Sequence, residues 1–379
     1  YEVNIMATVY TALGAGQPQF KRAWLNETIR QFRENSFWLK FMGEGQNNIV
    51  QRITELKKSE KGDRAMISLK ANLKSTGIVG DNDINGRRES IETYWVEIHT
   101  DQLRKQLASK GRVDDQQSVL NFRKEMRDSL GHWRAQINDE LGFLTASNIS
   151  YAYNTDGSAR VTGSEDLLTQ LEYAADVAAS PTSKRHFRFD GTSLQAGATA
   201  SIDSSHVPKY GALVDLCAEA RTRGIKPVKV KGQDVYVHVV HPKTWARYKK
   251  DADFRDVLVN ATPRQMDSPI FTGAAGFTVD GILFHVSNNV YNTLGAASGS
   301  KWGSGGTVDG TRSLLLGQQA LAYADIWGTD DWHEETFDSG AKNAVTHSLY
   351  DGWLKPKFMS RLDGDTVQDF GAICLDYYL

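Results

Sequence analysis

The most regular pattern in the chain is an apolar stripe of helical spacing. Apolar residues follow one another at intervals of three or four positions at Val119, Phe122, Met126, Leu130, Trp133, Ile137, Leu141 and Leu144. This spacing predicts an amphipathic helix, about 38 Å long at 1.5 Å per residue. Asp114 and Asp115 precede it as N-cap candidates. The stripe carries no histidine or carboxylate, so we interpret the helix as a structural beam.

A period of two replaces the helical period between Asn48 and Thr100. Apolar and polar residues alternate around Ile67 and again around Val96, which predicts two half-buried strands. The polar, glycine-bounded segment Gly77–Gly86 between them predicts the tip of a long hairpin. Because an isolated two-stranded hairpin is marginally stable, we expect this one to lie on another surface, on a neighbouring copy more than on its own body.

The first 45 residues combine an alanine- and glycine-rich start with aromatic anchors. The anchors are Phe20, Trp24, Phe32, Trp38 and Phe41. A helix is expected from about Lys21 to Phe32. Two interpretations stay open: an arm laid along another surface, and a terminal helix packed on its own domain.

A compact α/β pattern begins after Pro208. A helical face starts at Tyr210 and stops at Gly224. An apolar strand is predicted over Val235–Val240, and a hairpin is predicted around the dipeptide Asp280-Gly281. The segment Phe370–Leu379 is almost wholly apolar, which is typical of a central strand buried on both faces.

Four other segments have weaker patterns. We expect a short helix around residues 166–179 and a polar loop over 181–205. This loop holds the basic cluster Lys184–Arg188, which fits a solvated loop better than a nucleic-acid contact. We also expect a flexible excursion over the glycine- and serine-rich residues 295–311. A short strand and a helix are expected over 314–327.

Composition is that of an ordinary soluble globular protein. The 379 residues allow roughly two or three domains, with 40% hydrophobic and 24% charged residues. Two cysteines, Cys217 and Cys374, exclude a disulfide scaffold and fit a reducing compartment. No apolar run approaches the roughly 18–20 residues of a membrane span, and no secretory signal pattern is present.

Charge is unevenly distributed along the chain although the net charge is −2. Residues 206–264 hold 12 Lys/Arg and 6 Asp/Glu, whereas residues 265–379 hold 6 Lys/Arg and 14 Asp/Glu. Opposite charges on one chain suit head-to-tail contacts between identical copies. Equally open is that the two segments neutralise each other within one domain. Under the first interpretation, the candidate contacts between subunits are the bases Arg247, Lys249 and Arg255 and the acids Asp325, Asp330 and Glu334.

Motifs that carry catalytic or cofactor chemistry are missing from the sequence. It contains no phosphate-binding loop, dinucleotide fingerprint or nucleophile elbow. Its cysteines and histidines do not have the spacing of a zinc site. We therefore expect no catalytic residue, no cofactor and no enzymatic activity.

One segment matches the EF-hand calcium loop in form. The matching residues are Asp81, Asp83, Asn85, Gly86 and Glu92. An EF-hand needs a helix on each side, whereas both flanks here alternate as strands, and arginines would sit beside the ion. We favour a turn in which Asp and Asn side chains cap backbone amides. Alternatively, the charged residues of this segment pair with a neighbouring subunit, the candidates being Asp81, Asp83, Arg87, Arg88 and Glu89.

A series of short motifs runs in a fixed order through nearly the whole chain. The series is Gly62-Asp63-Arg64, Gly77-Ile78-Val79-Gly80-Asp81, Ile84-Asn85-Gly86-Arg87-Arg88-Glu89, Leu130-x-x-Trp133 with Asp139, His241-Pro242, Phe271-Thr272-Gly273-Ala274-Ala275-Gly276, Asp280-Gly281-Ile282, Gly317-Gln318-Gln319-Ala320 and Asp369-Phe370-Gly371. No single motif is specific. In this order, from about Met6 to Leu379, the set resembles the major capsid proteins of tailed bacteriophages.

The resemblance implies an α+β fold of the Johnson type, which tailed phages and herpesviruses share. Its parts would be an N-terminal arm (1–45), an extended E-loop hairpin with flanking strands (46–112), a P-domain with a long spine helix and a loop (113–205), a compact A-domain (206–335) and returning strands (336–379). The segments 181–205 and 295–311 depart from the family pattern.

The resemblance also implies a function. The chain would self-assemble into pentamers and hexamers of an icosahedral shell that encloses a double-stranded DNA genome. Its partners would be other copies, a portal, scaffolding or cement proteins, and packaged DNA in non-specific contact, with no membrane. The shell would form in the host cytoplasm and become the virion capsid. Two alternatives stay open: an encapsulin-like cellular compartment, and a calcium-binding module or metal enzyme that uses residues 81–92.

Overall fold

The computed structural model describes residues 28, 30, 35–54, 64–70, 77–85, 93–111, 122–160, 167–230, 232–260, 274–326 and 331–379. The chain divides into two compact units. The smaller comprises Tyr1–Ser36, Gln102–Ile137 and Gly328–Tyr350, and the larger comprises Phe37–Asp101, Asn138–Trp327 and Asp351–Leu379. Helix α3 (Phe122–Ser147) and strand β15 (Lys342–Leu354) contribute residues to both units.

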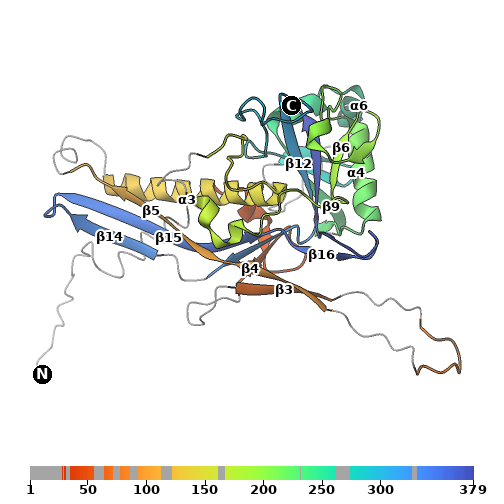
Figure 1. Cartoon of the computed structure of the whole chain (residues 1–379), viewed down its shortest axis with the longest axis horizontal. Coiled ribbons are helices and arrows are strands. Elements are labelled where there is room, and N and C mark those ends of the chain that lie inside the picture. The colour runs from red at the N-terminus through yellow and green to blue at the C-terminus, as the bar shows by residue number, and fades with distance from the viewer. Residues whose placement is uncertain are drawn as a thin grey trace, which may run out of the picture. The chain divides into compact units, whose positions relative to one another are not determined.

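An eight-stranded mixed sheet is the main layer of the larger unit. Its strand order is β10-β11-β9-β12-β18-β6-β7, and β8 pairs with β9 (Figure 1). The strands are β6 (His186–Phe189), β7 (Leu194–Ala196), β8 (Val228–Val230), β9 (Gln233–Val240), β10 (Ala274–Val279), β11 (Ile282–Val286), β12 (Gly310–Leu316) and β18 (Ala372–Tyr378). The predicted C-terminal central strand is confirmed, because β18 lies between β12 and β6 and is buried along nearly its whole length.

Three helices accompany this sheet: α4 (Tyr210–Thr222), α5 (Pro242–Tyr248) and α6 (Ala252–Asn260). Leu213 and Leu216 of α4, Tyr248 of α5 and Phe254 of α6 are buried in one core with side chains of the sheet. The predicted stop of α4 is confirmed, since Gly224 has a φ of 72°, a conformation that costs glycine little. The strand predicted over Val235–Val240 is confirmed as well.

A second sheet region of the larger unit joins segments far apart in the sequence. Strand β2 (Val50–Ile53) lies between β1 (Met42–Gly43) and β13 (Leu321–Asp325), both parallel to it, and β13 pairs antiparallel with residues 351–354 of β15. Two hairpins complete the unit: β3 (Arg64–Lys70) with β4 (Thr93–His99), and β16 (Lys357–Ser360) with β17 (Thr366–Asp369).

Two of the aromatic anchors of the N-terminal segment are fixed in the larger unit. Trp38 and Phe41 are buried in the short 3₁₀ helix η1 (Trp38–Phe41). The backbone N–H groups of Phe37 and Trp38 donate to the Asp139 carboxylate at 2.6 and 3.3 Å, and the Trp38 indole N–H donates to the Asp139 carbonyl at 3.2 Å. Asp139 therefore holds Phe37 and Trp38 against α3. Of the helix expected over Lys21–Phe32, the structure describes residues 28 and 30, and both are helical.

In the smaller unit, the central strand is the first part of β15. Strand β14 (Asp331–Phe337) pairs antiparallel with residues 342–348, and β5 (Asp101–Ala108) also pairs with β15. Leu130 of α3 packs with Trp332 and Val345 in a small core that Met126 and Trp133 border. The predicted beam helix is thus confirmed over Phe122–Ser147; Asp114, Asp115 and Val119 lie outside the described residues.

The expectation of a solvated loop at the basic cluster Lys184–Arg188 is wrong. His186–Phe189 form strand β6, which pairs in parallel with β18. Phe187 and Phe189 are buried in the sheet core. Arg185 is buried in an ion pair with Asp363, and the buried His186 Nε2 lies 2.6 Å from an Asp376 oxygen. Polarity misled the prediction because the acidic partners of these two side chains lie far away in the sequence.

Three further expectations are corrected. Residues 314–327 contain no helix within the described part; they continue β12, turn at Gln319 with a φ of 51° and form β13. The segment 295–311 is held by backbone pairing, including a bridge between Trp302 and Val308, and Trp302 is buried. In the region 166–179, two short 3₁₀ turns, Leu168–Gln170 and Glu172–Ala174, replace the expected helix.

Burial along α3 and β15 leads to a stability prediction. Trp133 is half-buried, so Trp133→Ala should lower the free energy of unfolding by about 1–3 kcal/mol. Trp353 is fully buried, and its indole N–H donates to Asn138 Oδ1 at 3.2 Å. Trp353→Ala should therefore lower the free energy of unfolding further, by about 3–5 kcal/mol. Equilibrium urea unfolding of both variants tests the order, and the reverse order would contradict it.

Candidate assembly site

The hairpin β3–β4 has one buried and one exposed face. Its register runs from Arg64 opposite His99 to Lys70 opposite Thr93. Ala65, Ile67 and Ile98 are buried on the inner face. They pack in one cluster with other residues of the same unit: Ile53, Ala322, Ala324, Leu354 and Phe358. The base of the hairpin therefore lies on its own body, with the face that the alternation predicts.

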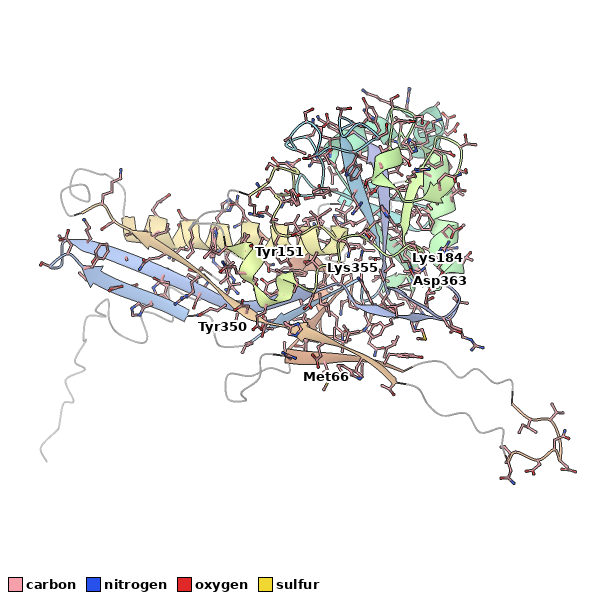
Figure 2. All side chains as sticks on the ribbon, in the orientation of Figure 1. Met66, Tyr151, Lys184, Tyr350, Lys355 and Asp363 are labelled. Atoms are coloured by element: carbon pink, nitrogen blue, oxygen red, sulfur yellow. The ribbon has the colours of Figure 1, made fainter. Side chains whose placement is uncertain are left out.

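The outer face and the tip of the hairpin expose large apolar side chains. Met66 and Trp95 on the outer face are 63% and 60% exposed, and Val79 and Ile84 at the tip are 84% and 61% exposed (Met66 is labelled in Figure 2). Every described residue of the segment 77–85 is exposed or half-buried. Apolar side chains gathered in this way on a soluble protein mark an interaction surface.

The calcium interpretation has little support in the structure. Asp81, Asp83 and Asn85 are exposed, and Asp83 Oδ1 accepts the backbone N–H of Asn85 at 2.9 Å, as in a capped turn. The described elements on either side of the tip, β3 and β4, are strands and not the helices of an EF-hand. Gly86, Arg87, Arg88, Glu89 and Glu92 lie outside the described residues. In the part of the chain that is described, no group of three or more His, Cys, Asp or Glu side chains is placed to hold a metal ion.

The C-terminal end of α3 is closed by a Schellman motif. Asn148 follows the last helical residue with a φ of 55°. Its N–H donates to the Thr145 carbonyl at 3.2 Å, and the N–H of Ile149 donates to the Leu144 carbonyl at 3.0 Å. This pattern satisfies two of the carbonyls that a helix end leaves without partners.

Two buried cations complete this helix end. Arg312 Nη1 donates to the Ser147 carbonyl at 2.8 Å, and Lys355 Nζ donates to Asn148 Oδ1 at 2.6 Å (Lys355 is labelled in Figure 2). Positive charge is favourable here because the C-terminal end of a helix carries a partial negative charge. Since both side chains are buried, each also needs an anion beside it.

Both anions come from the last eleven residues of the chain. Asp376 of β18 accepts from Arg312 Nε at 2.8 Å and is 2.6 Å from His186 Nε2. Asp369 lies 3.0 Å from Lys355 Nζ. Burial alone would lower the pKa of Arg312 and Lys355 and raise that of Asp376. The close partners outweigh burial, so the pKa of Arg312 and of Lys355 is raised and that of Asp376 is lowered.

A third buried acid links three segments. Asp363 lies 2.8 Å from Arg185 Nη1 and 2.8 Å from Arg223 Nη1, so it joins the turn after β16 to the residue before β6 and the residue after α4 (Asp363 is labelled in Figure 2). Sequence reasoning missed all these pairs. The one available signal was Asp376, a charge inside an otherwise apolar strand.

Two motifs of the ordered series meet in the larger unit. The N–H groups of Gly317, Gln318 and Gln319 donate to the carbonyls of Gly371, Lys226 and Asn48 at 2.8, 2.9 and 2.8 Å. A Cβ atom on Gly371 would lie 2.2 Å from the Gln318 carbonyl oxygen. Gly371 is therefore needed for close backbone approach, which explains these two motifs as one packing unit.

The charged candidates for contacts between subunits occupy different settings. Arg247 Nη1 donates to the Tyr378 carbonyl at 2.9 Å, whereas Lys249 and Arg255 are exposed. Asp325 pairs with Arg52 of the same chain. Glu334 accepts from the Trp332 indole N–H at 2.9 Å. Asp330 lies outside the described residues.

Comparison with known proteins identifies this architecture. The capsid of Ralstonia phage GP4 matches with a TM-score of 0.76 and 25% identity, over 97% of this chain and 98% of that chain. The cyanophage Pam1 capsid asymmetric unit matches with a TM-score of 0.66 and 16% identity, over 91% and 92%. The fold is therefore a phage capsid fold, and the expected α+β class of the Johnson type is confirmed.

Sequence comparison defines the family. The family model described as "Phage capsid protein" matches residues 18–379. The major capsid protein of Pseudomonas phage KPP25 is 38% identical over 368 residues, 96% of each chain. This chain belongs to the phage capsid protein family and is a structural component of a virion. All the relatives described here come from phages, which favours a virus shell over an encapsulin-like compartment. Among the described helices, none has the length and apolar character to span a membrane.

The buried pair at the helix end predicts a large loss on mutation. Arg312→Met leaves Asp376 buried without its main partner and removes the donor to Ser147, so the free energy of unfolding should fall by about 3–5 kcal/mol. Lys226→Met, at an exposed position, is the matched control and should change it by less than about 0.5 kcal/mol. Chemical denaturation measures both, and a small loss for Arg312→Met would contradict the assignment.

The buried His238 predicts acid sensitivity. Burial lowers the pKa of His238 from 6.5 to about 4, although Nδ1 hydrogen-bonds the Leu314 carbonyl at 3.1 Å. Between these pH values the unfolded chain binds a proton that the folded protein excludes, so stability falls as pH is lowered, by about 3 kcal/mol in total. His238→Gln keeps a donor and should reduce the slope of stability against pH between 6.5 and 4, while the contribution of His241, whose pKa burial also lowers to about 4, remains. The exposed His333→Gln is the control, and an unchanged slope in His238→Gln would contradict the prediction.

Proposed function

We propose that this chain is the shell-forming major capsid protein of a double-stranded DNA phage, self-assembling into hexamers and pentamers of an icosahedral capsid. The observation that carries this proposal is the match of almost the full length to the major capsid protein of Pseudomonas phage KPP25. Electron microscopy of the purified protein tests it directly. Closed shells of uniform size support it, and a protein that stays monomeric at all concentrations contradicts it.

The structure supports this role through the contrast between its parts. The larger unit has a densely paired core, fixed by buried ion pairs at the end of α3. The hairpin tip and the outer face of β3–β4, in contrast, expose apolar side chains. A shell needs both features, because identical subunits must keep one fold while their contacts close into rings.

Further partners follow from the proposed role. Copies of the chain are the main partner, and a portal and scaffolding or cement proteins would join the shell. The net charge of −2 suits a wall that touches packaged DNA without binding it tightly. Assembly would take place in the host cytoplasm. Purification of particles followed by mass spectrometry would identify the companion proteins.

Charge pairing between copies is part of the proposal. Lys249 and Arg255 are exposed bases of the segment with excess positive charge, and they suit acids of the segment 265–379 on a neighbouring copy. Charged residues of the hairpin tip, such as Asp81 and Asp83, suit bases in the same way. Each exposed pair contributes about 0–1 kcal/mol, repeated in every subunit, and is weakened by salt.

Deleting the hairpin tip tests its role in assembly. Removal of Gly77–Gly86 should leave the core of the larger unit folded, because the described tip residues are exposed, but should prevent shells from forming. A milder variant, Val79→Ser with Ile84→Ser, keeps the loop length and removes the apolar contact. Sedimentation and electron microscopy measure assembly, while thermal unfolding reports the fold. Shells of normal yield from both variants would contradict the prediction.

A further inference from the structure

Among its described residues, the smaller unit presents two edge strands that flank one central strand. Residues 342–348 of β15 pair with β14. Strand β5 also pairs with β15. Just beyond β5, the Ser109 N–H donates to the Asn343 carbonyl at 2.8 Å, and Ser109 Oγ accepts from the Asn343 N–H at 3.1 Å. A strand has two hydrogen-bonding edges, so β5 and β14 lie on opposite sides of β15 (Figure 1).

These two edges carry opposite charge. The segment 331–338, which covers β14, holds four Asp/Glu and no Lys or Arg. The segment 101–111, which covers β5, holds three Lys/Arg and one Asp. Successive strand residues point to opposite faces. Arg104 and Lys105 therefore place one positive charge on each face of β5, and Glu334 and Glu335 place one negative charge on each face of β14.

Four of these charged side chains have no ion-pair partner in the described part of the chain. Arg104, Lys105, Lys110 and Glu335 are exposed. None of the four forms an ion pair with another described residue, unlike Asp338, which lies 3.1 Å from Lys342 Nζ. They cannot neutralise one another within one sheet, because the width of β15 separates the two edges.

We propose that the acidic β14 edge of one copy docks against the basic β5 edge of a second copy. The inference rests on the proposed shell function and names a surface for it. Charge complementarity identifies the occupant: a β14 edge repels another β14 edge, and a β5 edge repels another β5 edge. The contact is therefore head-to-tail, and such contacts close into rings or extend into a lattice.

The strand edges themselves add to the argument. An exposed edge strand offers unpaired backbone N–H and C=O groups, and proteins discourage uncontrolled pairing by placing charges along it. The two edges carry charges of opposite sign. Two β14 edges or two β5 edges therefore repel each other, whereas a β14 edge attracts a β5 edge. The lengths agree, since β5 has eight residues and β14 has seven.

Charge reversal on each edge tests the proposal. One variant carries Arg104→Glu with Lys105→Glu, and a second carries Glu334→Lys with Glu335→Lys. Each alone should reduce the yield of assembled particles by at least about tenfold. The four changes combined in one chain should restore assembly, and so should a mixture of the two variants. Lys184→Glu with Lys226→Glu, two exposed positions outside this sheet, is the control of equal charge change and should assemble normally.

Zero-length coupling of amines to carboxylates gives an independent reading on the unaltered protein. In assembled particles made from isotopically light and heavy chains, coupling should join Lys105 or Lys110 to Glu334 or Glu335 in mixed light–heavy peptides. Unassembled protein should lack these peptides. Thermal unfolding shows whether a reversal variant is folded, and where it is not, the coupling result decides.

Distinct outcomes separate the two claims. Absence of shells from the unaltered protein overturns the proposed function. Shells that form normally while both reversal variants also assemble normally, or shells that yield no mixed coupled peptide between these segments, overturn the edge contact alone. The edge contact is also overturned if the reversal variants are folded but do not assemble, and neither their mixture nor the combined variant restores assembly.

Discussion

The larger unit depends on how the C-terminal end of α3 is neutralised away from water. A helix end presents unpaired carbonyls and a partial negative charge, and here it is buried. Arg312 and Lys355 supply the positive charge, and burying two cations demands two anions. Asp369 and Asp376 meet that demand from the end of the chain. The helix, the central strand β18 and the loop before β6 are therefore fixed together, because leaving any of these charges unpaired would be expensive.

This arrangement suits a structural protein of a shell. At the end of α3, the buried acids and bases pair with one another across the core. What the molecule offers to the outside is edges and extensions, namely the hairpin with exposed Met66 and Trp95, its tip, and the two charged strand edges beside β15. Binding surfaces of this kind add up over many copies, so each contact can be weak while the assembly is stable.

Local patterns in the sequence were sufficient to predict an element wherever one of its faces is buried and the other is exposed to solvent. The stripe from Phe122 to Leu144 predicted α3, the alternation around Ile67 and Val96 predicted the hairpin and its inner face, and Asp280-Gly281 predicted a turn whose residues have φ values of 49° and 79°. The ordered motifs carry the resemblance to the capsid family, and two of them meet in close backbone packing at Gly317 and Gly371.

By itself, then, the sequence determined the helix, the hairpin and the central C-terminal strand, since each depends on periodicity within a short segment, whereas the capsid fold was implied by resemblance to a known family. Only the tertiary structure decided which charged side chains are buried and which partners they have. Arg185 and His186 seemed solvated because their neighbours in the sequence are polar. Their side chains are nevertheless buried beside Asp363 and Asp376, which lie nearly 180 or more residues later in the chain. The same holds for β5 and β14, whose opposite charges lie over 200 residues apart in the chain and become two edges of one sheet through pairing with β15. Electrostatic partners are set by distance in space, which no local pattern encodes.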